Sequence, residues 1–297
     1  MLFSNKNAAE KRADLRAAMR GDEILQVPGA FSPLAAMEIE KHGFPAVYIS
    51  GAVLASDLGL PDVGLTTLSE VAGRGQQIAR VTDLPCIIDA DTGFGEPMAV
   101  ARTVRTLEEA GLAGCHIEDQ ILPKRCGHLD HKAVVETEIM VQKIRAAVAA
   151  RRDQNFLIIA RCDARSVEGL DAAARRAQAY AEAGADVIFP EALTDLDEFR
   201  QIREASEKPM LANMTEFGKS DLFTATELQD AGYDIVIYPV TLWRLAMGAA
   251  VDGLGEIKRN GSQQALLGRM QHRRELYDTL RYADYQAFDQ NIYNFEV

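Results

Sequence analysis

Residues 182–191 read EAGADVIFPE, and this stretch indicates how the chain folds. A helix-forming segment ends at Gly184, and a short apolar run, partly β-branched, follows it. Glycine tolerates the left-handed conformation that ends a helix, and short apolar runs bounded in this way are typical of buried strands. The stretch is therefore interpreted as a helix end that leads directly into a buried strand.

The same unit occurs at three other places in the chain. It reads KHGFPAVYIS at 41–50, EAGLAGCHIED at 109–119 and DAGYDIVIYP at 230–239. Four more strands are predicted at 24–28 (ILQVP), 85–91 (PCIIDAD), 155–163 (NFLIIARCD) and 208–213 (KPMLAN). Strands that alternate with helices imply a parallel sheet with crossover helices. Eight such units over about 250 residues favour an α/β fold of the (β/α)8 TIM-barrel type over an open doubly wound sheet.

The helical segments predict one domain with an extension. At 136–151 the apolar residues Met140, Val141, Ile144 and Val148 share one face, and charges occupy the other. No linker-like change in composition interrupts the series, so residues 1–297 are predicted to form a single barrel domain. A C-terminal helical extension (about 254–297) is expected to pack on the barrel or on a neighbouring subunit through Leu266, Leu267, Met270, Leu276, Tyr277 and Leu280.

Composition excludes several classes of function. With 47% hydrophobic residues in 297, the chain has ample material for a packed core. No window approaches the ~20 apolar residues of a membrane span, and the N-terminus lacks a signal-like apolar region, so we expect a cytoplasmic protein without a membrane partner. Four cysteines without a close pair indicate reduced thiols. The net charge of -12 argues against nucleic acid, whereas small anions need only a local cluster of cations.

Polar residues follow nearly every predicted strand. In a barrel of this type the chemistry lies at the carboxyl ends of the strands. Solvation of strand ends explains one or two such residues, but not a ring of them. In chain order the ring is Ser50, Gly51, Ala52, Asp89, Asp91, Glu118, Asp119, Arg161, Asp163, Glu191, Asn213, Thr215, Tyr238 and Pro239.

A metal site is predicted at Asp89, Asp91 and Glu118. Asp89 and Asp91 are two residues apart, so a strand directs both carboxylates to one side, and Glu118 ends the next strand. Oxygen ligands without a histidine pair suit Mg2+ or Mn2+ rather than Zn2+. The alternative is that these carboxylates pair with Arg161 or Lys124. His116 is predicted to be a hydrogen-bonded core residue rather than a ligand.

Cys126 differs from the other cysteines because it follows the fourth strand in a loop, IEDQILPKRCGHLDHK at 117–132. Cys86, Cys115 and Cys162 are predicted to be inert core thiols. The cations around Cys126 lower a thiol pKa, whereas loop closure raises it. Such a thiol serves as a nucleophile or a proton donor on a lid, and the alternative is an exposed bystander.

Five stretches together resemble the isocitrate lyase and phosphoenolpyruvate mutase superfamily: HIEDQILPKRCGH, IIDADTGFG, LGLPDVG, FPEAL and LANMTEFG. The resemblance extends from about residue 24 to Tyr277, and KRCGH is specific for its lyase branch. It implies a (β/α)8 barrel that performs a Mg2+-dependent, retro-aldol-like (retro-Claisen) cleavage to an α-keto acid and succinate. It also implies a homo-oligomer, a tetramer, that acts on a small di- or tricarboxylate.

The resemblance assigns roles to the matching residues. Asp89 and Asp91, with Glu118 and Asp62 in the outer shell, would hold Mg2+, and Cys126 would be the general acid. The base would be Tyr48, Asp62 or a water on the metal. The keto-acid carboxylate would be bound by Ser50, Gly51, Ala52 and Arg161. The succinate portion would be held by Gly127, His128, Glu191, Asn213 and Thr215, with Arg244 and Arg273 as further contacts.

Two positions bear on the substrate. Ala52 stands where relatives have glycine, and Ile237 stands where leucine is expected, beside the matching Phe189. Phe189 and Ile237 would line an apolar pocket for a methyl group, and an Ile-for-Leu exchange is nearly volume-neutral. The expected reaction is the cleavage of 2-methylisocitrate to pyruvate and succinate. The alternatives are 2,3-dimethylmalate or oxaloacetate as substrate on the same scaffold, or a non-catalytic metabolite-binding protein.

Overall fold

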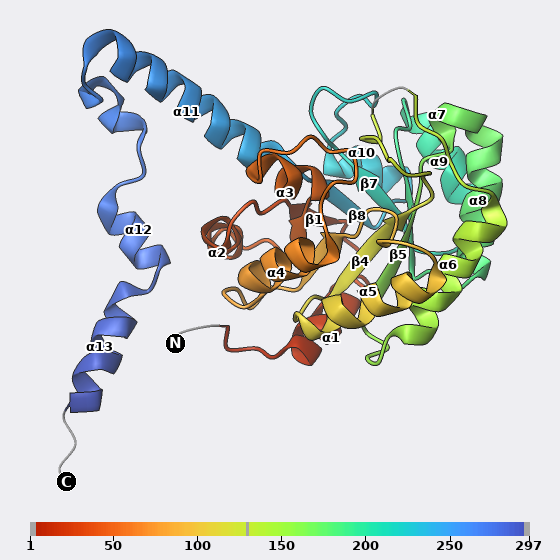
Figure 1. The fold of residues 1–297 in the computed structure, drawn as a ribbon, viewed down its shortest axis with the longest axis horizontal. Coiled ribbons are helices and arrows are strands. Elements are labelled where there is room, and N and C mark those ends of the chain that lie inside the picture. Colours follow the sequence, from red (N-terminus) through yellow and green to blue (C-terminus); the bar gives the residue numbers. More distant parts are fainter. Residues whose placement is uncertain (1–3, 129–130, 294–297) are drawn as a thin grey trace.

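Eight parallel strands form the centre of the protein in the computed structural model, which describes residues 4–128 and 131–293 (Figure 1). Each strand lies within a stretch that the sequence predicts. They are short and almost wholly buried, which explains their continuous apolar sequences. The strands are β1 (Leu25–Pro28), β2 (Val47–Ile49), β3 (Cys86–Asp89), β4 (Gly114–Glu118), β5 (Leu157–Cys162), β6 (Val187–Pro190), β7 (Leu211–Asn213) and β8 (Ile235–Tyr238).

The strands close into a barrel. One run of paired strands has the order β2-β3-β4-β5-β6 and the other the order β1-β8-β7. Isolated parallel bridges join the two runs, from Gly29 to Tyr48 at one seam and from Ile188 to Met210 at the other. The order around the barrel is therefore the order along the chain, and the predicted (β/α)8 architecture is confirmed.

Helices surround the barrel, and their ends carry the expected caps. Helix α4, for example, begins with a capping box in which Thr67 and Glu70 bond each other's backbone N–H groups. The helices up to the last strand are α1 (Ala8–Ala18), α2 (Pro33–Lys41), α3 (Gly51–Asp57), α4 (Leu68–Ala79), α5 (Pro97–Glu109), α6 (Thr137–Ala150), α7 (Arg165–Glu168), α8 (Leu170–Glu182), α9 (Leu196–Glu204) and α10 (Ala225–Asp230).

Helix α6 confirms the helix predicted at 136–151, but its buried face is shifted. Met140 and Ile144 are fully buried, whereas Val141 and Val148 are only half-buried. Lys143 occupies the buried face instead, and its Nζ donates to Thr92 O at 3.0 Å. A lysine can bury its methylene chain when the ammonium reaches a carbonyl, which a hydrophobic pattern does not register.

The C-terminal helices are α11 (Thr241–Asn260), the 3-10 helix η1 (Gln264–Arg269), α12 (Arg273–Thr279) and α13 (Tyr282–Tyr293). Helix α11 extends away from the barrel. The chain then turns back, and α12 and α13 run past the side of the barrel that carries α2 (Figure 1). Contact with the barrel is made through α12, where Thr279 Oγ1 donates to Glu38 Oε1 of α2 at 2.8 Å. Leu267 and Met270, predicted to pack, are about half exposed, at 60% and 49%.

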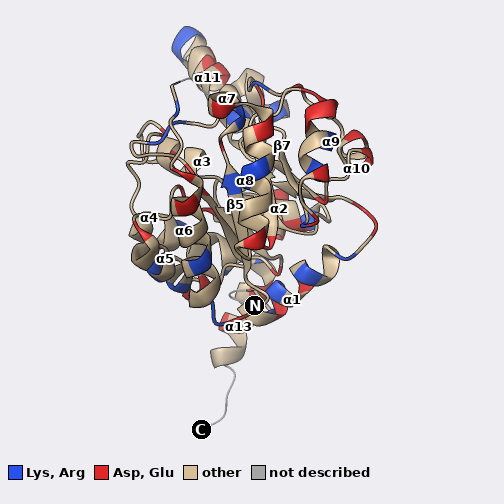
Figure 2. Cartoon of the chain, turned by 90° about the vertical axis from the view of Figure 1, so that its right-hand side faces the viewer, with Lys and Arg blue, Asp and Glu red and all other residues tan. Residues whose placement is uncertain are grey.

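Charge is spread over the outside. In the view of Figure 2, Lys and Arg alternate with Asp and Glu over the outer helices instead of forming one patch. No helix in the described part of the chain is both long and apolar enough to cross a membrane.

Candidate active site

The carboxyl ends of β3 to β6 bring together a buried group of charged side chains. Asp89, Glu118, Arg161 and Glu191 are each at most 7% exposed. Arg161 lies at the centre of the group: its Nη1 is 3.3 Å from Glu118 Oε2 and its Nη2 is 3.4 Å from Glu191 Oε2. Because burial of this many charges is costly without mutual pairing, the arrangement indicates a site rather than a solvated strand end.

A lysine from the loop after β4 lies against the carboxylates of this site. Lys124 Nζ is 2.7 Å from Asp91 Oδ1 and also forms an ion pair with Asp62. The pairing with Lys124, stated above as the alternative to a metal site, is thus present for Asp91. Burial opposes the charge of Lys124, but Glu118, Asp89 and the neighbouring carboxylates raise its pKa above the usual value. Lys124 therefore remains a cation that partly neutralises the cluster.

The cluster fits a divalent cation that keeps water ligands. Neither carboxylate oxygen of Glu118 has a hydrogen-bond partner among the described residues, although the side chain is fully buried. Burial raises the pKa of Glu118 well above its usual range, against the opposing charge of Arg161. Within residues 4–128 and 131–293, no three His, Cys, Asp or Glu side chains converge tightly enough to hold a metal unaided. Mg2+ typically binds one or two carboxylates and keeps several waters, so a buried carboxylate without hydrogen bonds suits it.

The backbone of the β2–α3 turn lies directly against Asp89. Gly51 N donates to Asp89 Oδ2 at 3.2 Å, and a Cβ at position 51 would lie 2.7 Å from the same oxygen. Ser50 is buried at the N-cap of α3, where its hydroxyl makes no capping bond, and Ala52 is half-buried. Glycine is thus required at position 51 so that the backbone can approach the carboxylate.

A second hydrogen-bonded group surrounds Glu191. His128 Nε2 is 2.7 Å from Glu191 Oε1, and Asn213 Nδ2 lies 3.3 Å from both oxygens. Burial raises the pKa of Glu191, but Arg161 and His128 outweigh it and hold the pKa well below its usual range. The predicted residues Gly127, His128, Glu191 and Asn213 are therefore brought together. Thr215 follows β7 and is half-buried.

Cys126 lies in the loop over this group and is partly buried. A Cβ on its neighbour Gly127 would be 2.4 Å from both Arg161 Nη2 and Glu191 Cγ, so the loop backbone packs directly on the charged group. Burial raises the pKa of the Cys126 thiol and outweighs the lowering by His128 and Arg161. A protonated thiol suits a proton donor better than a nucleophile.

The other three thiols lie in strands and are buried. Burial raises the pKa of Cys86 and of Cys115 to about 12, and the pKa of Cys162 well above the usual value. This agrees with the prediction of inert core thiols.

An aromatic layer lies below the charged group. The Tyr48 hydroxyl and His116 Nε2 are 2.7 Å apart, and the Phe189 ring meets the His116 ring edge-on at 5.3 Å between centroids. Burial lowers the pKa of His116 to about 4, in agreement with the predicted core role, and raises the pKa of Tyr48 well above its usual value. Ile237 is fully buried.

The two arginines predicted as further contacts lie in different places. Arg244, on α11, is 2.9 Å from Glu216 Oε2 and stacks over the Phe217 ring at 5.2 Å. Arg273 begins α12, which packs on α2 at the outside of the barrel, so the single chain does not bring Arg273 to the strand ends.

Sequence reasoning assigned no role to several residues around the site. Asp163 was predicted in the ring of strand-end residues, and it binds Arg161 through both carboxylate oxygens, at 2.9 and 3.2 Å. Gln120 and Lys132, at the two ends of the Cys126 loop, are buried and bond to its backbone. The only sequence feature that marks Gln120 and Lys132 is that a polar residue lies some positions before and after the cysteine, and this pattern is too common to predict a role. Asp91 has a φ of 46°, a strained value for a non-glycine residue that is frequent at functional positions.

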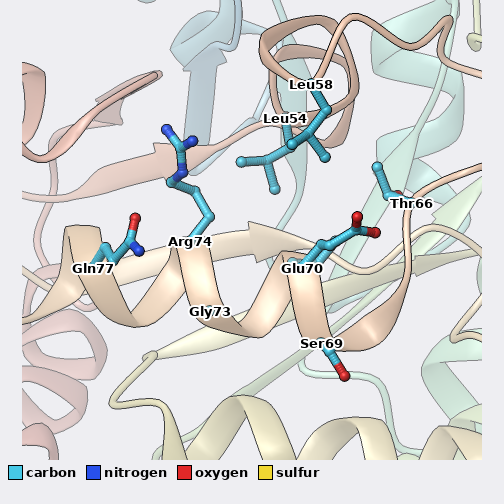
Figure 3. A pocket seen from close by; sticks show the side chains of 9 residues that line it. Leu54, Leu58, Thr66, Ser69, Glu70, Gly73, Arg74 and Gln77 are labelled. Carbon is cyan, nitrogen blue, oxygen red and sulfur yellow. The ribbon is translucent and has the colours of Figure 1, made fainter.

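A cavity of about 260 Å³ lies outside this group, between α3 and α4 (Figure 3). Its lining includes Leu54, Leu58, Glu70 and Arg74. None of the predicted site residues lines it, although Thr66 at its edge donates to Asp91 Oδ2 at 3.4 Å. The cavity is therefore separate from the charged group.

Comparison with known proteins identifies the family of this chain. The model of the phosphoenolpyruvate phosphomutase family matches residues 15–258. The chain is similar to probable 2-methylisocitrate lyase 2 of Corynebacterium glutamicum, with 60% identity over 100% of this chain and 97% of the relative. It is also similar to 2-methylisocitrate lyase of Aeropyrum pernix, with 50% identity over 94% of this chain and 90% of the relative.

Solved structures agree in fold along the chain. Oxaloacetate acetylhydrolase in complex with the inhibitor 3,3-difluorooxalacetate gives a TM-score of 0.90 at 31% identity, over 98% of this chain and 100% of that one. 2,3-Dimethylmalate lyase gives a TM-score of 0.88 at 33% identity, over 97% of this chain and 96% of that one. Phosphonopyruvate hydrolase, solved with oxalate and Mg++, gives a TM-score of 0.85 at 29% identity, over 94% of this chain and 98% of that one.

Proposed function

The chain belongs to the phosphoenolpyruvate mutase and isocitrate lyase superfamily, and we propose that it acts as a carbon–carbon lyase that cleaves 2-methylisocitrate to pyruvate and succinate. The protonated thiol of Cys126, on a loop whose next residue Gly127 packs directly against Arg161 and Glu191, carries this proposal. Relatives named 2-methylisocitrate lyase or probable 2-methylisocitrate lyase are 45–60% identical over 91–100% of this chain, whereas the structures of dimethylmalate lyase and oxaloacetate acetylhydrolase are 30–33% identical.

The reaction needs one base and one acid. A base takes the hydroxyl proton of the substrate, the C–O bond becomes a carbonyl, and the bond to the neighbouring CH carbon breaks. The electron pair stays on that carbon, next to a carboxylate, and takes the thiol proton of Cys126 to give succinate. Burial raises the pKa of Tyr48, which disfavours it as the base and leaves Asp62, which pairs with Lys124, or a water molecule.

Fixed cations would bind the carboxylates. Arg161 would hold the pyruvate end together with the backbone at Ser50, Gly51 and Ala52. The succinate end would lie against the residues around Glu191, including Gly127, His128, Asn213 and Thr215, with Arg244 at the rim. Their pairing in the structure keeps the groups aligned before substrate arrives, which preserves the electrostatic stabilisation of the developing charge.

Asp89, Asp91 and Glu118, with Asp62 in the outer shell, would hold Mg2+, and Mn2+ is the alternative. When bound, the ion supplies positive charge at the oxygens of the pyruvate end. The Glu118 oxygens, which make no hydrogen bond to the described residues and are balanced by Arg161 alone among the ion pairs described, and the Mg++ in the phosphonopyruvate hydrolase structure support this assignment.

Phe189 and Ile237 would accept the substrate methyl group. Both are buried, and Phe189 is held between His116 and the guanidinium of Arg161, whose Cζ is 5.3 Å from the ring centre. A methyl group in such a pocket is worth about 10- to 200-fold in kcat/KM, so 2-methylisocitrate should be preferred to isocitrate by roughly this factor.

The proposed activity is tested by measuring kcat/KM for 2-methylisocitrate, isocitrate, 2,3-dimethylmalate and oxaloacetate at one Mg2+ concentration. We expect the highest value for 2-methylisocitrate and poor turnover of phosphonates. Faster turnover of 2,3-dimethylmalate or oxaloacetate would contradict the assignment of 2-methylisocitrate as the substrate, but it would not affect the assignment to the superfamily. No turnover of any of the four acids would favour a metabolite-binding protein.

Three wider expectations belong to this proposal. The protein acts in the cytoplasm, which its four free cysteines support. Residues 1–297 form one barrel domain with a C-terminal helical extension, about 254–297. The chain assembles into a homo-oligomer, a tetramer, that binds small carboxylates and neither nucleic acid nor membrane.

A further inference from the structure

The loop that carries Cys126 is paired at its base. Ile121 N donates to Ala133 O and Val135 N donates to Asp119 O, both at 2.8 Å, and Gln120 and Val134 form an antiparallel bridge. The loop thus begins and ends at one fixed place beside the end of β4. Two side chains at this base point back into the loop.

Gln120 holds the peptide before Cys126. Its Nε2 donates to Arg125 O at 2.9 Å, and its Oε1 accepts from Arg125 N at 2.8 Å. The side chain is only 2% exposed, and both of its polar atoms are used by one residue of the loop. A buried amide that satisfies both backbone groups of a single residue fixes the position of that residue.

Lys132 holds the peptide after Cys126. Its Nζ donates to Gly127 O at 2.6 Å and to Asp163 Oδ1 at 2.9 Å, and its side chain is 1% exposed. Asp163 in turn binds Arg161. Lys132 therefore ties the loop backbone to the carboxylate that orients the central arginine.

We propose that Gln120 and Lys132 are positioning residues that hold Cys126 from either side and direct its thiol to the carbon that it protonates. Neither residue touches the substrate in this arrangement; each acts through the backbone of a neighbour of Cys126. The inference rests on the proposed function of Cys126 as proton donor. A shift of about 1 Å in a catalytic group lowers the rate roughly 100-fold, so bonds on both sides of the cysteine matter for turnover.

Gln120→Met is the sharpest variant because the amide contacts only Arg125 in these bonds, and methionine has a similar length. We expect kcat for 2-methylisocitrate to fall by roughly 10- to 100-fold with a smaller change in KM. Gln120→Glu keeps the acceptor for Arg125 N and loses the donor to Arg125 O, so its kcat should lie between the values of the wild-type protein and Gln120→Met. Lys132→Met should lower kcat and also raise KM, because it disturbs Asp163 beside Arg161.

A second measurement needs no substrate. The rate at which iodoacetamide alkylates Cys126, located by peptide mass spectrometry, should rise about 2- to 10-fold for each hydrogen bond lost as the thiol becomes more accessible. The buried Cys86, Cys115 and Cys162 should stay unlabelled in the folded protein. Faster alkylation of Gln120→Met supports the inference even if the wild-type protein does not cleave 2-methylisocitrate, in which case only the proposed function fails.

Lys11→Met is the matched control. Lys11 is also buried and donates to two backbone carbonyls, of Ala79 at 2.7 Å and Thr82 at 2.6 Å, but it comes from α1 and lies away from the Cys126 loop. We expect it to lower the melting temperature and leave kcat and Cys126 alkylation unchanged. The inference is overturned if Gln120→Met keeps the wild-type kcat and alkylation rate, or if Lys11→Met changes both as strongly.

Discussion

At the scale of the residue, the thiol of Cys126 is the group whose chemistry is most specific. Its pKa is raised by burial, so it carries a proton at neutral pH, and a thiol is far more acidic than an alcohol. Cys126→Ser should therefore lower kcat by about 10²- to 10⁴-fold. Succinate binding, measured by calorimetry, should persist. Near-normal turnover of the variant would remove the general-acid role.

Asp91 offers a separate test of the metal site. Its φ of 46° is strained for most residues but tolerated by asparagine, so Asp91→Asn removes the charge with little backbone cost. Chelation should abolish wild-type turnover and Mg2+ should restore it, whereas Asp91→Asn should recover little at the same Mg2+ concentration. Full activity of Asp91→Asn after exhaustive chelation would contradict a metal held at this position.

The site residues differ in how far the sequence predicts them. Asp89 follows from the sequence because it ends β3, whereas Asp91 lies beyond the strand with a φ of 46°, so the alternation of a strand does not specify its direction. The contacts of Gln120 and Lys132 depend on how an irregular loop folds back, and no local pattern specifies that. Arg273 was assigned by resemblance alone, and in the single chain it lies on an outer helix.

At the scale of the element, the N-terminal segment is fastened to the barrel by Asp83. Its carboxylate accepts from Ser4 Oγ and Asn5 N, both at 2.6 Å. Burial opposes the charge, but the hydrogen bonds from residues 4–6 outweigh it and hold the pKa of Asp83 below its usual value. A lowered folded-state pKa stabilises the fold above the unfolded pKa of about 3.9, and this contribution is lost as the pH falls through the lower value.

Amide hydrogen exchange of residues 4–6 measures this contribution. In the wild-type protein, protection should be constant from neutral pH down to about 4 and should decrease below it. Asp83→Asn should show reduced protection already at neutral pH and little further pH dependence. Equal protection of the two proteins at neutral pH would contradict the fastening role.

The loop after β4 is the element predicted to move. Residues 120–133 are expected to be mobile without ligand and closed with it, because Cys126 must both admit and enclose the substrate. Residues 129 and 130 lie outside the described part of the chain. Hydrogen exchange of the loop should slow when succinate and pyruvate are added, while exchange of the buried strand β5 should not change. Identical exchange of the loop in both states would argue against a lid.

At the scale of the whole molecule, the eight strands were predictable because each is a short apolar run, and four of them directly follow a glycine-ended helix. The closure of β1 against β8 follows from the count of units and not from any single residue. The direction of α11 was not predictable. Its sequence is apolar enough to pack, as at Leu245 and Leu254, yet the structure leaves the helix without a single buried residue.

The exposed apolar side chains of α11 support the proposed homo-oligomer. Leu245, Val251 and Leu254 are 65–69% exposed along one 20-residue helix, and an apolar surface of this kind is typical of an interface. We expect light scattering at micromolar concentration to give the mass of a tetramer, a number that comes from the resemblance to the family. A monomeric mass would refute the assembly.

Substitution on α11 tests whether this helix makes the contact. Leu245→Asp combined with Leu254→Asp should lower the mass, because burying two unpaired carboxylates in an apolar interface is costly. The matched control is Met98→Asp, an exposed apolar residue of α5 at 88%, which should leave the mass unchanged. If the α11 variant kept the full mass, the contact would have to lie elsewhere on the molecule, and the exposed helix would need another partner.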